Sequence, residues 1–288
     1  MKFSLFPGCI ASSEQFACEL SAREVLPRLG IELMDLQGAS CCGYPFTGVT
    51  SPISWTYLTA RNTALAERNG AGLLPLCNTC HLSFCEVRKD LRENTEQMVL
   101  INDNLSAEGL RYTGDLEIVH LLEVLYDEVG LKKIKRKVTK PLENLKLAAH
   151  PGCHAFRPRT LKRPDDNRNP RKLNELIEIL GAESPDYPEK LDCCGSYMLL
   201  RDEKSALKMA GMKLKSIKEA GFDGLVTTCP MCFKIFDSKQ DAISRMLGND
   251  AVKIPVMYYT QLLGSAMDIA NEKLGLHLNL SPIEKLCD

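Results

Sequence analysis

Short apolar runs alternate with longer segments of helical pattern along the chain. Apolar residues at helical spacing predict a helix over 55–70, which ends in a glycine as a helix C-cap commonly does, and over its counterpart 204–221. Six short runs bounded by turn residues predict strands: KFSLF (2–6), GLLPL (72–76), LEIVH (116–120), LKLAA (145–149), GLVTT (224–228) and IPVMY (254–258). The alternation predicts an α/β fold with a small, mostly parallel sheet flanked by helices in each half.

The two halves repeat one cysteine pattern. Cys9 is followed by the pair Cys41-Cys42 and then by Cys77-x-x-Cys80, and Cys153 is followed by the pair Cys193-Cys194 and then by Cys229-x-x-Cys232. The spacer from the pair to the CxxC motif has the same length in both halves, whereas the spacer before the pair is longer in the second half. The flanks repeat too, since LFPGC (5–9) matches AHPGC (149–153), SCCGY (40–44) matches DCCGS (192–196), and NGAGLLPLCNTC (69–80) overlays GFDGLVTTCPMC (221–232). Such self-similarity predicts two tandem, pseudo-symmetric copies of one module.

The repeat divides the chain. We expect a first module over residues 1–131, a basic linker over 132–144, and a second module with a C-terminal tail over 145–288. The linker contains KKIKRKVTKP, which we interpret as a solvated segment; docking onto a partner protein is the alternative.

Composition narrows the function classes. The 288 residues are 44% hydrophobic and 25% charged, as in an ordinary globular protein, and the net charge of −1 gives no field for nucleic acid or an anionic membrane surface. The N-terminus lacks a signal-peptide pattern, and no apolar run is long enough for a membrane span, so we expect a cytoplasmic protein. Thirteen cysteines in that compartment are expected to be reduced thiols rather than disulfides.

Clustered thiolates are soft ligands that suit zinc or iron–sulfur clusters. A structural zinc takes four ligands, and a cubane or [2Fe–2S] cluster takes four cysteines, whereas each module offers five. Adjacent cysteines chelate one ion poorly but can reach neighbouring irons. The pattern therefore predicts a multi-iron cluster in each module. Gly8, Gly43, Gly152 and Gly195 beside the cysteines are expected to form tight turns, to bring N–H groups near sulfur, or both.

The doubled CCG module resembles the cysteine-rich B-type subunit of heterodisulfide reductase over essentially the whole chain, most closely in PRKLNELIEILGAESPDYPEKLDCCG (170–195). The resemblance implies two noncubane [4Fe–4S] clusters, each built from fused [3Fe–4S] and [2Fe–2S] units with five cysteine ligands. It implies that the disulfide of coenzyme M and coenzyme B is cleaved between them to two thiols. The implied ligands, catalytic through the clusters they hold, are Cys9, Cys41, Cys42, Cys77 and Cys80 for the first cluster and Cys153, Cys193, Cys194, Cys229 and Cys232 for the second.

Electrons for such a reaction must come from a partner, because the chain has no flavin or nicotinamide fingerprint and no ferredoxin-type run of cysteines. The resemblance implies a small iron–sulfur partner with two cubane clusters (the C-type subunit of heterodisulfide reductase) and a flavin partner (the A-type subunit), with a hydrogenase or formate dehydrogenase as a candidate in a larger complex. Two alternatives stay open. One is an electron-transfer subunit of a lactate, glycolate, succinate or sulfur-compound oxidoreductase that binds no disulfide; the other is a zinc-binding scaffold. The completeness of both five-cysteine sets favours disulfide chemistry.

Other residues are candidates for the substrate. His81 and His154 each follow a ligand cysteine and could donate protons to a departing thiolate, although we favour hydrogen bonding to the cluster or backbone. Arg157 is the best candidate for contact with an anionic disulfide, because it lies four residues from Cys153 in a basic segment, 157–172, whose alternative role is a solvated loop or docking face. Side chains predicted to be structural or incidental are His120, His150, Cys18, Cys85 and Cys287.

Two segments are expected to touch the substrate cavity and to differ from methanogen members of the family. These are CCGSYMLLRD (193–202) and PGCHAFRP (151–158). The identity of the disulfide therefore stays open at this point.

Overall fold

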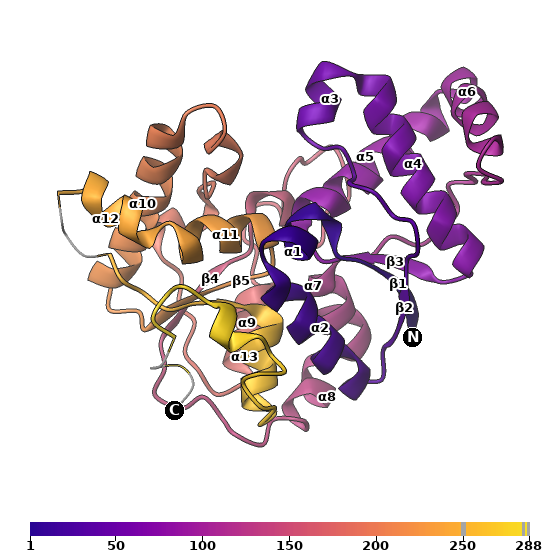
Figure 1. Cartoon of the computed structure of the whole chain (residues 1–288). Coiled ribbons are helices and arrows are strands. Elements are labelled where there is room, and N and C mark those ends of the chain that lie inside the picture. Colours follow the sequence, from indigo (N-terminus) through magenta and orange to yellow (C-terminus); the bar gives the residue numbers. More distant parts are fainter. Residues whose placement is uncertain (249–251, 284–285, 287–288) are drawn as a thin grey trace.

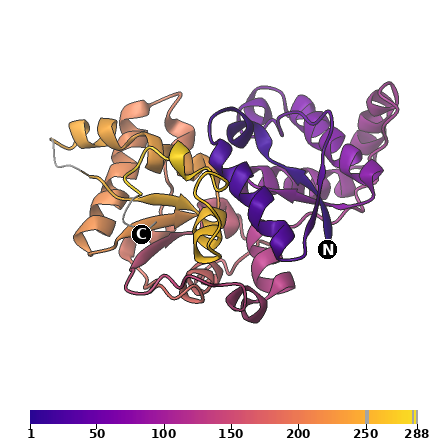
Figure 2. The same ribbon diagram turned by 60° about the horizontal axis from the view of Figure 1, so that its bottom comes forward.

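Two parallel sheets of three strands form the frame of the molecule. The computed structural model describes residues 1–248, 252–283 and 286. The first sheet has the order β2-β1-β3 and the second β4-β5-β6, with every pair parallel. The strands are β1 (Lys2–Phe6), β2 (Glu32–Asp35), β3 (Gly72–Pro75), β4 (Leu147–His150), β5 (Gly224–Thr227) and β6 (Val256–Tyr258). The two sheets lie in separate halves of the molecule, side by side (Figure 2).

Helices connect the strands and cover both sheets (Figure 1). Those of the first half are α1 (Gly8–Ser13), α2 (Phe16–Arg28), α3 (Phe46–Thr50), α4 (Pro52–Asn69), α5 (Asn78–Glu93), α6 (Thr95–Ser106), α7 (Leu121–Glu123), the π-helix η1 (Val124–Val129) and α8 (Leu131–Lys135). Those of the second half are α9 (Lys172–Glu178), α10 (Glu203–Glu219), α11 (Pro230–Ser238), α12 (Gln240–Met246), α13 (Tyr259–Ala266) and the 3-10 turns η2 (Cys153–Ala155), η3 (Pro188–Leu191), η4 (Ser196–Met198) and η5 (Leu276–Leu278).

The α/β prediction is confirmed, and so are both predicted helices, which correspond to α4 and α10. The glycine after α4, Gly70, has φ +64° and accepts the left-handed conformation expected of a C-cap. Five of the six predicted strands are present as β1, β3, β4, β5 and β6.

The prediction of a strand over 116–120 is wrong. Only Ile118 pairs there, by a single parallel bridge to Leu73, because His120 already caps the following helix in a capping box with Glu123. The strand β2 was not predicted, because it is a four-residue edge strand whose two end residues are exposed, so that no apolar alternation marks it. A bridge between Lys146 and Glu183 takes the matching position in the second half.

The two halves share one continuous hydrophobic core, to which both sheets contribute. In each half, a helix near the C-terminal end also packs against the other half. The late helix α13 lies beside α2 of the first half, where the Oγ atom of Ser21 and the Oγ1 atom of Thr260 are 2.6 Å apart. In return η1 meets α9, and the Tyr126 hydroxyl donates to Glu175 over 2.5 Å. The modules therefore form one folding unit, with a shared face between them.

The basic segment between the halves is partly helical. Within residues 132–141 the single buried side chain is Ile134 of α8, whereas Lys132, Lys133, Lys135, Arg136, Lys137 and Lys140 are exposed. The boundaries proposed for the linker stay a prediction. Within the described residues, no helix has both the length and the apolar character that a membrane crossing requires.

Candidate functional site

Four cysteines lie just past the ends of strands. Cys77 follows β3 and Cys229 follows β5, and each is the extended N-cap residue of the next helix. The CxxC spacing then places Cys80 and Cys232 in the first turn of α5 and α11, on the side of the helix that faces the strand end. Cys9 after β1 and Cys153 after β4 complete the arrangement at the equivalent positions.

The adjacent pairs lie in loops that enter the same sites. A glycine with positive φ follows each pair, Gly43 at +79° and Gly195 at +82°. Its backbone N–H donates to the sulfur two residues earlier, over 3.3 Å to Cys41 Sγ and 3.4 Å to Cys193 Sγ. Both expectations for these glycines are met, because each makes the turn and also presents an N–H group to sulfur.

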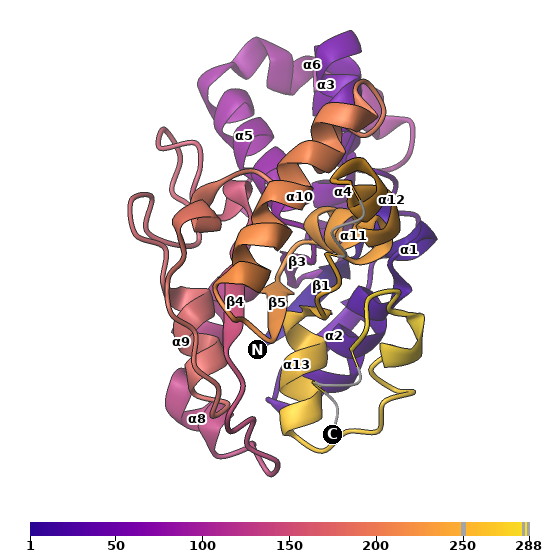
Figure 3. The same ribbon diagram turned by 90° about the vertical axis from the view of Figure 1, so that its left-hand side faces the viewer.

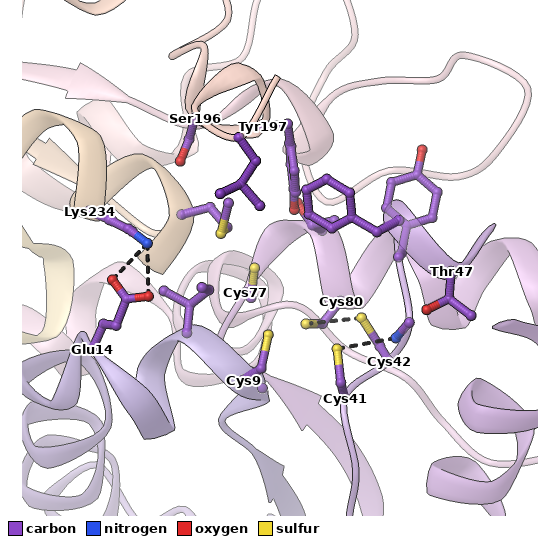
Figure 4. A pocket seen from close by; sticks show the side chains of 18 of the residues that line it. Cys9, Glu14, Cys41, Cys42, Thr47, Cys77, Cys80, Ser196, Tyr197 and Lys234 are labelled. Atoms are coloured by element: carbon purple, nitrogen blue, oxygen red, sulfur yellow. Dashed lines mark hydrogen bonds and ion pairs between the residues drawn. The ribbon is translucent and has the colours of Figure 1, made fainter. Parts of the chain in front are cut away.

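The five sulfurs of the first half face one cavity of about 280 Å³ (Figure 4). Cys42 Sγ and Cys80 Sγ are 3.5 Å apart, and Cys9 and Cys41 are exposed at its edge. The opposite wall comes from the second half, through Ser196, Tyr197, Leu199, Leu200, Met231 and Lys234. The cavity therefore lies between the two modules. Of the two segments expected to touch it, CCGSYMLLRD contributes lining residues, whereas no residue of PGCHAFRP is among them.

The second set of five is more enclosed. Cys194, Cys229 and Cys232 are buried, and Cys153 and Cys193 are partly exposed. The two sets meet where Cys77 Sγ and Cys229 Sγ approach to 3.8 Å. The twelve cysteines within the described residues are all free thiols.

Hydrogen bonds between neighbouring thiols favour ionisation of the first cysteine of each adjacent pair, and bonds from Cys229 and Cys80 lower the pKa of Cys77 as well. Bonds from Cys42 and Cys9 lower the pKa of Cys41 to about 2. Bonds from Cys153 and Cys194 lower the pKa of Cys193 to about 2 in the same way. Metals bind the thiolate rather than the thiol, so this direction of shift is consistent with a metal-binding role.

One cation lines the cavity. Lys234 of α11 projects from the wall and pairs with Glu14 over 2.6 Å. No other basic side chain is among the cavity-lining residues that the structure describes. Lys234 follows Cys232 by two residues and was not among the predicted site residues.

The three residues predicted to contact substrate lie in different surroundings. His154 is partly buried, with its Nδ1 atom 2.9 Å from Thr79 Oγ1, a lining residue of the cavity; burial lowers its pKa, so the ring is neutral at pH 7. His81 is buried, and its Nδ1 lies 3.2 Å from the guanidinium of Arg163. Arg157 is exposed and lies over the Phe156 ring at 5.0 Å, outside the cavity lining. Substrate contact by these three residues stays a prediction.

The remaining cysteines and histidines are largely as expected. Cys18 and Cys85 are buried, whereas Cys287 lies outside the described residues. His120 is structural, because it caps α7 and its Nε2 lies 2.8 Å from Asn78 Oδ1. His150 is buried and bonded to Lys213, with one ring nitrogen within 4.8 Å of the sulfurs of Cys194 and Cys232.

Three buried polar residues beside the site were missed. Lys213 shares the core-facing spacing of Ala206, Ala210 and Ile217, and this was the available signal. Nothing in the sequence distinguishes Arg163 from the other basic residues of its segment, yet its guanidinium binds the carbonyl of His154. Asn78 follows a cysteine and joins the halves, since its Nδ2 donates to Pro151 O over 2.6 Å.

Family models match most of the chain. A cysteine-rich domain matches residues 3–85 and again 147–237, and an HdrB-like C-terminal domain matches 196–279. The first match confirms the repeat, and its two copies contain all ten predicted ligand cysteines.

Characterised relatives are similar over nearly their full length. The chain is 37% identical to the B-type subunit of the ferredoxin/F420H2-dependent CoB-CoM heterodisulfide reductase of Methanosarcina acetivorans, over 96% of this chain and 93% of that protein. It is 32% identical to the 8-methylmenaquinol:fumarate reductase membrane anchor subunit of Wolinella succinogenes, over 99% of both chains. Among solved structures, a hypothetical protein from Helicobacter pylori shares the fold, with a TM-score of 0.78 and 20% identity; the match covers 97% of this chain and 52% of that chain.

Proposed function

The chain belongs to the family of heterodisulfide reductase B-type subunits, and from this premise we propose that it is the catalytic iron–sulfur subunit of a heterodisulfide-reductase-type complex. Its reaction is the reduction of a disulfide, that of coenzyme M and coenzyme B or a related one, to two thiols. The observation that carries the proposal is the pair of complete five-cysteine sets, which meet at Cys77 and Cys229 beside a cavity between the modules.

The donor set fits two noncubane [4Fe–4S] clusters. Each half supplies five thiols, from strand ends and from the loop that carries the adjacent pair, together with backbone N–H donors; Glu14, the one acidic residue among the described residues that line the cavity, is already paired with Lys234. The first cluster would be held by Cys9, Cys41, Cys42, Cys77 and Cys80. The second would be held by Cys153, Cys193, Cys194, Cys229 and Cys232. When bound, the clusters would supply the two electrons that cleavage of a disulfide requires, one at a time.

Residues of the chain itself would bind the disulfide substrate and deliver protons to the thiolates formed from it. Reduction of a disulfide takes two electrons and two protons and gives two thiols; the electrons would come from the small iron–sulfur partner and the flavin partner of the complex. Lys234, held by Glu14, offers a positive charge to an anionic group of the substrate. Thr79 holds a hydroxyl proton at the cavity wall with His154 behind it, so this pair is our candidate for proton delivery to a thiolate.

A second function is favoured by one relative. The Wolinella protein is named as an anchor subunit of a fumarate reductase, and it aligns with 99% of this chain. An equivalent role here would relay electrons between partner proteins without binding a disulfide. Turnover separates the two candidates, since only the first predicts that the complex consumes a disulfide.

We expect about eight irons and eight sulfides per chain in protein purified anaerobically, because two four-iron clusters are proposed. The complex should reduce coenzyme M–coenzyme B disulfide or another disulfide offered in a panel. Stoichiometric zinc with negligible iron would contradict the cofactor assignment. Full iron with no disulfide consumed by the intact complex would favour the relay function.

Arg157→Ala tests the predicted contact outside the cavity lining. If the arginine closes onto an anionic end of the substrate, losing its charge-assisted hydrogen bond should weaken disulfide binding by about 1.5–3 kcal/mol. Lys234→Met is the comparison within the cavity, and there we expect a loss of similar size. Binding that Lys234→Met weakens and Arg157→Ala leaves unchanged would assign Arg157 to solvent or to a partner-docking face.

A further inference from the structure

The two cysteine sites differ at the residue that directly precedes the repeated PGC motif. LFPGC and AHPGC align Phe6 with His150. The two rings also have equivalent surroundings in the structure. Phe6 packs edge to face against Phe84, and His150 packs edge to face against Phe236, with 5.0 Å between the ring centroids in both pairs. The second site therefore has an imidazole where the first has a hydrocarbon ring.

A second difference lies at the carbonyl before each cysteine pair. Ser40 O accepts from the neutral amide of Asn62 over 3.1 Å. At the matching position, Asp192 O accepts from the ammonium of Lys213 over 2.7 Å. Lys213 belongs to α10, which runs beside α11 (Figure 3), and is only 1% exposed, so solvent does not screen its charge.

The bonds of Lys213 determine which nitrogen of His150 carries the proton. An ammonium has three N–H donors. They point to Asp192 O at 2.7 Å, Lys190 O at 3.4 Å and His150 Nδ1 at 2.9 Å. Because all three groups accept, Nδ1 has no hydrogen, and the ring proton lies on Nε2.

That N–H group has no hydrogen-bond acceptor, and the buried cation has no carboxylate counter-ion among the described residues. Nε2 of His150 is buried and makes no hydrogen bond. In the part of the chain that the structure describes, no carboxylate lies within ion-pair distance of Lys213. The sulfurs of Cys194 and Cys232 lie within 4.8 Å of a His150 ring nitrogen. Buried donors and cations favour negative charge nearby, and these sulfurs can supply it, as can the carboxylate of Asp192, whose charge also acts on Lys213.

We propose that His150 and Lys213 make the second cysteine site the preferred electron acceptor of the chain. Acting through Cys194 and Cys232, they stabilise added negative charge, so that a cluster held there is reduced at a higher potential than one held by the first site. This inference rests on the iron–sulfur clusters of the proposed function. Electrons that enter the chain would then collect in the second module, although the two modules repeat one fold.

The test is a redox titration of the anaerobically purified, iron-loaded protein, followed by electron paramagnetic resonance. His150→Phe copies the first module into the second, and Lys213→Gln replaces the cation with an amide of the kind Asn62 provides. We expect the wild-type second site to be reduced at the higher potential. Each variant should lower the reduction equilibrium constant of that site at least tenfold, or about 59 mV for one electron, with the first site and the iron content unchanged.

Lys208→Gln is the matched control, because it removes the same charge from an exposed position of α10 and should shift neither potential. The inference is overturned if the second potential moves no more than in this control, if both sites shift together, or if both variants lose the second cluster and so act as ligand supports. If His150→Phe alone loses iron, the potential of the second site in Lys213→Gln decides whether the inference holds. Wild-type protein without iron would instead defeat the proposed function itself.

Discussion

Cys194→Ser is expected to abolish disulfide reduction and to lower the iron content from about eight to about four per chain, with the spectrum of the first cluster retained. The serine hydroxyl is a poor ligand for iron compared with a thiolate. Cys194 and Cys42 occupy equivalent positions, each the buried second cysteine of its pair. Cys42→Ser should therefore produce the opposite result, with the second spectrum retained. Metal analysis, electron paramagnetic resonance and an assay of the intact complex would measure the three effects.

These positions are the informative ones because they lie away from the junction of the two sets. Cys77 and Cys229 approach each other to 3.8 Å, so a change at either could disturb both sites. Cys85→Ala is a suitable control, since Cys85 is buried in α5 and belongs to neither set. Loss of both spectra in Cys194→Ser would mean that the ligands are shared between the modules, and our assignment of five to each would be wrong.

Much of the frame could be predicted because local patterns determine it. The strands β1, β3, β4 and β5 were predictable as short apolar runs bounded by turn residues, and each ends two or three residues before the first cysteine of a PGC or CxxC motif. The edge strand β2 could not be found in the same way. Only two of its four residues are even partly buried, and pairing with β1 rather than its own pattern makes it a strand.

The contacts between the halves could not be predicted from the sequence. The repeat suggests two separate modules, whereas α13 packs on α2 and η1 packs on α9. The same limit applies at the site. The alignment of Phe6 with His150 was visible in the motifs, but Lys213 lies 63 residues from His150, and no local pattern brings them together. The cavity wall from η4 and α11 likewise depends on how the modules meet.

Gly152→Ala should destabilise the protein more than an ordinary loop substitution, because Gly152 lies where the halves join. Its φ of +78° strains any L side chain, at a cost of about 1–2 kcal/mol. A Cβ atom would also lie 2.6 Å from Asn78 Nδ2 and so displace the amide that donates to Pro151 O. The buried Asn78 also pairs with His120, so losing these bonds adds about 1–3 kcal/mol. We expect the free energy of unfolding to fall by about 2–5 kcal/mol in total.

Gly221→Ala separates the two contributions. Gly221 has φ +70°, but a Cβ atom there would meet nothing within 4 Å, so only the backbone strain of about 1–2 kcal/mol should appear. Denaturant unfolding of both iron-loaded variants under anaerobic conditions gives the comparison. Because Cys153 follows Gly152 directly, the same variant should also lose iron from the second site, whereas Gly221→Ala should retain it. Equal losses of stability with full iron in both variants would show that Asn78 and Pro151 do not hold the second site in place.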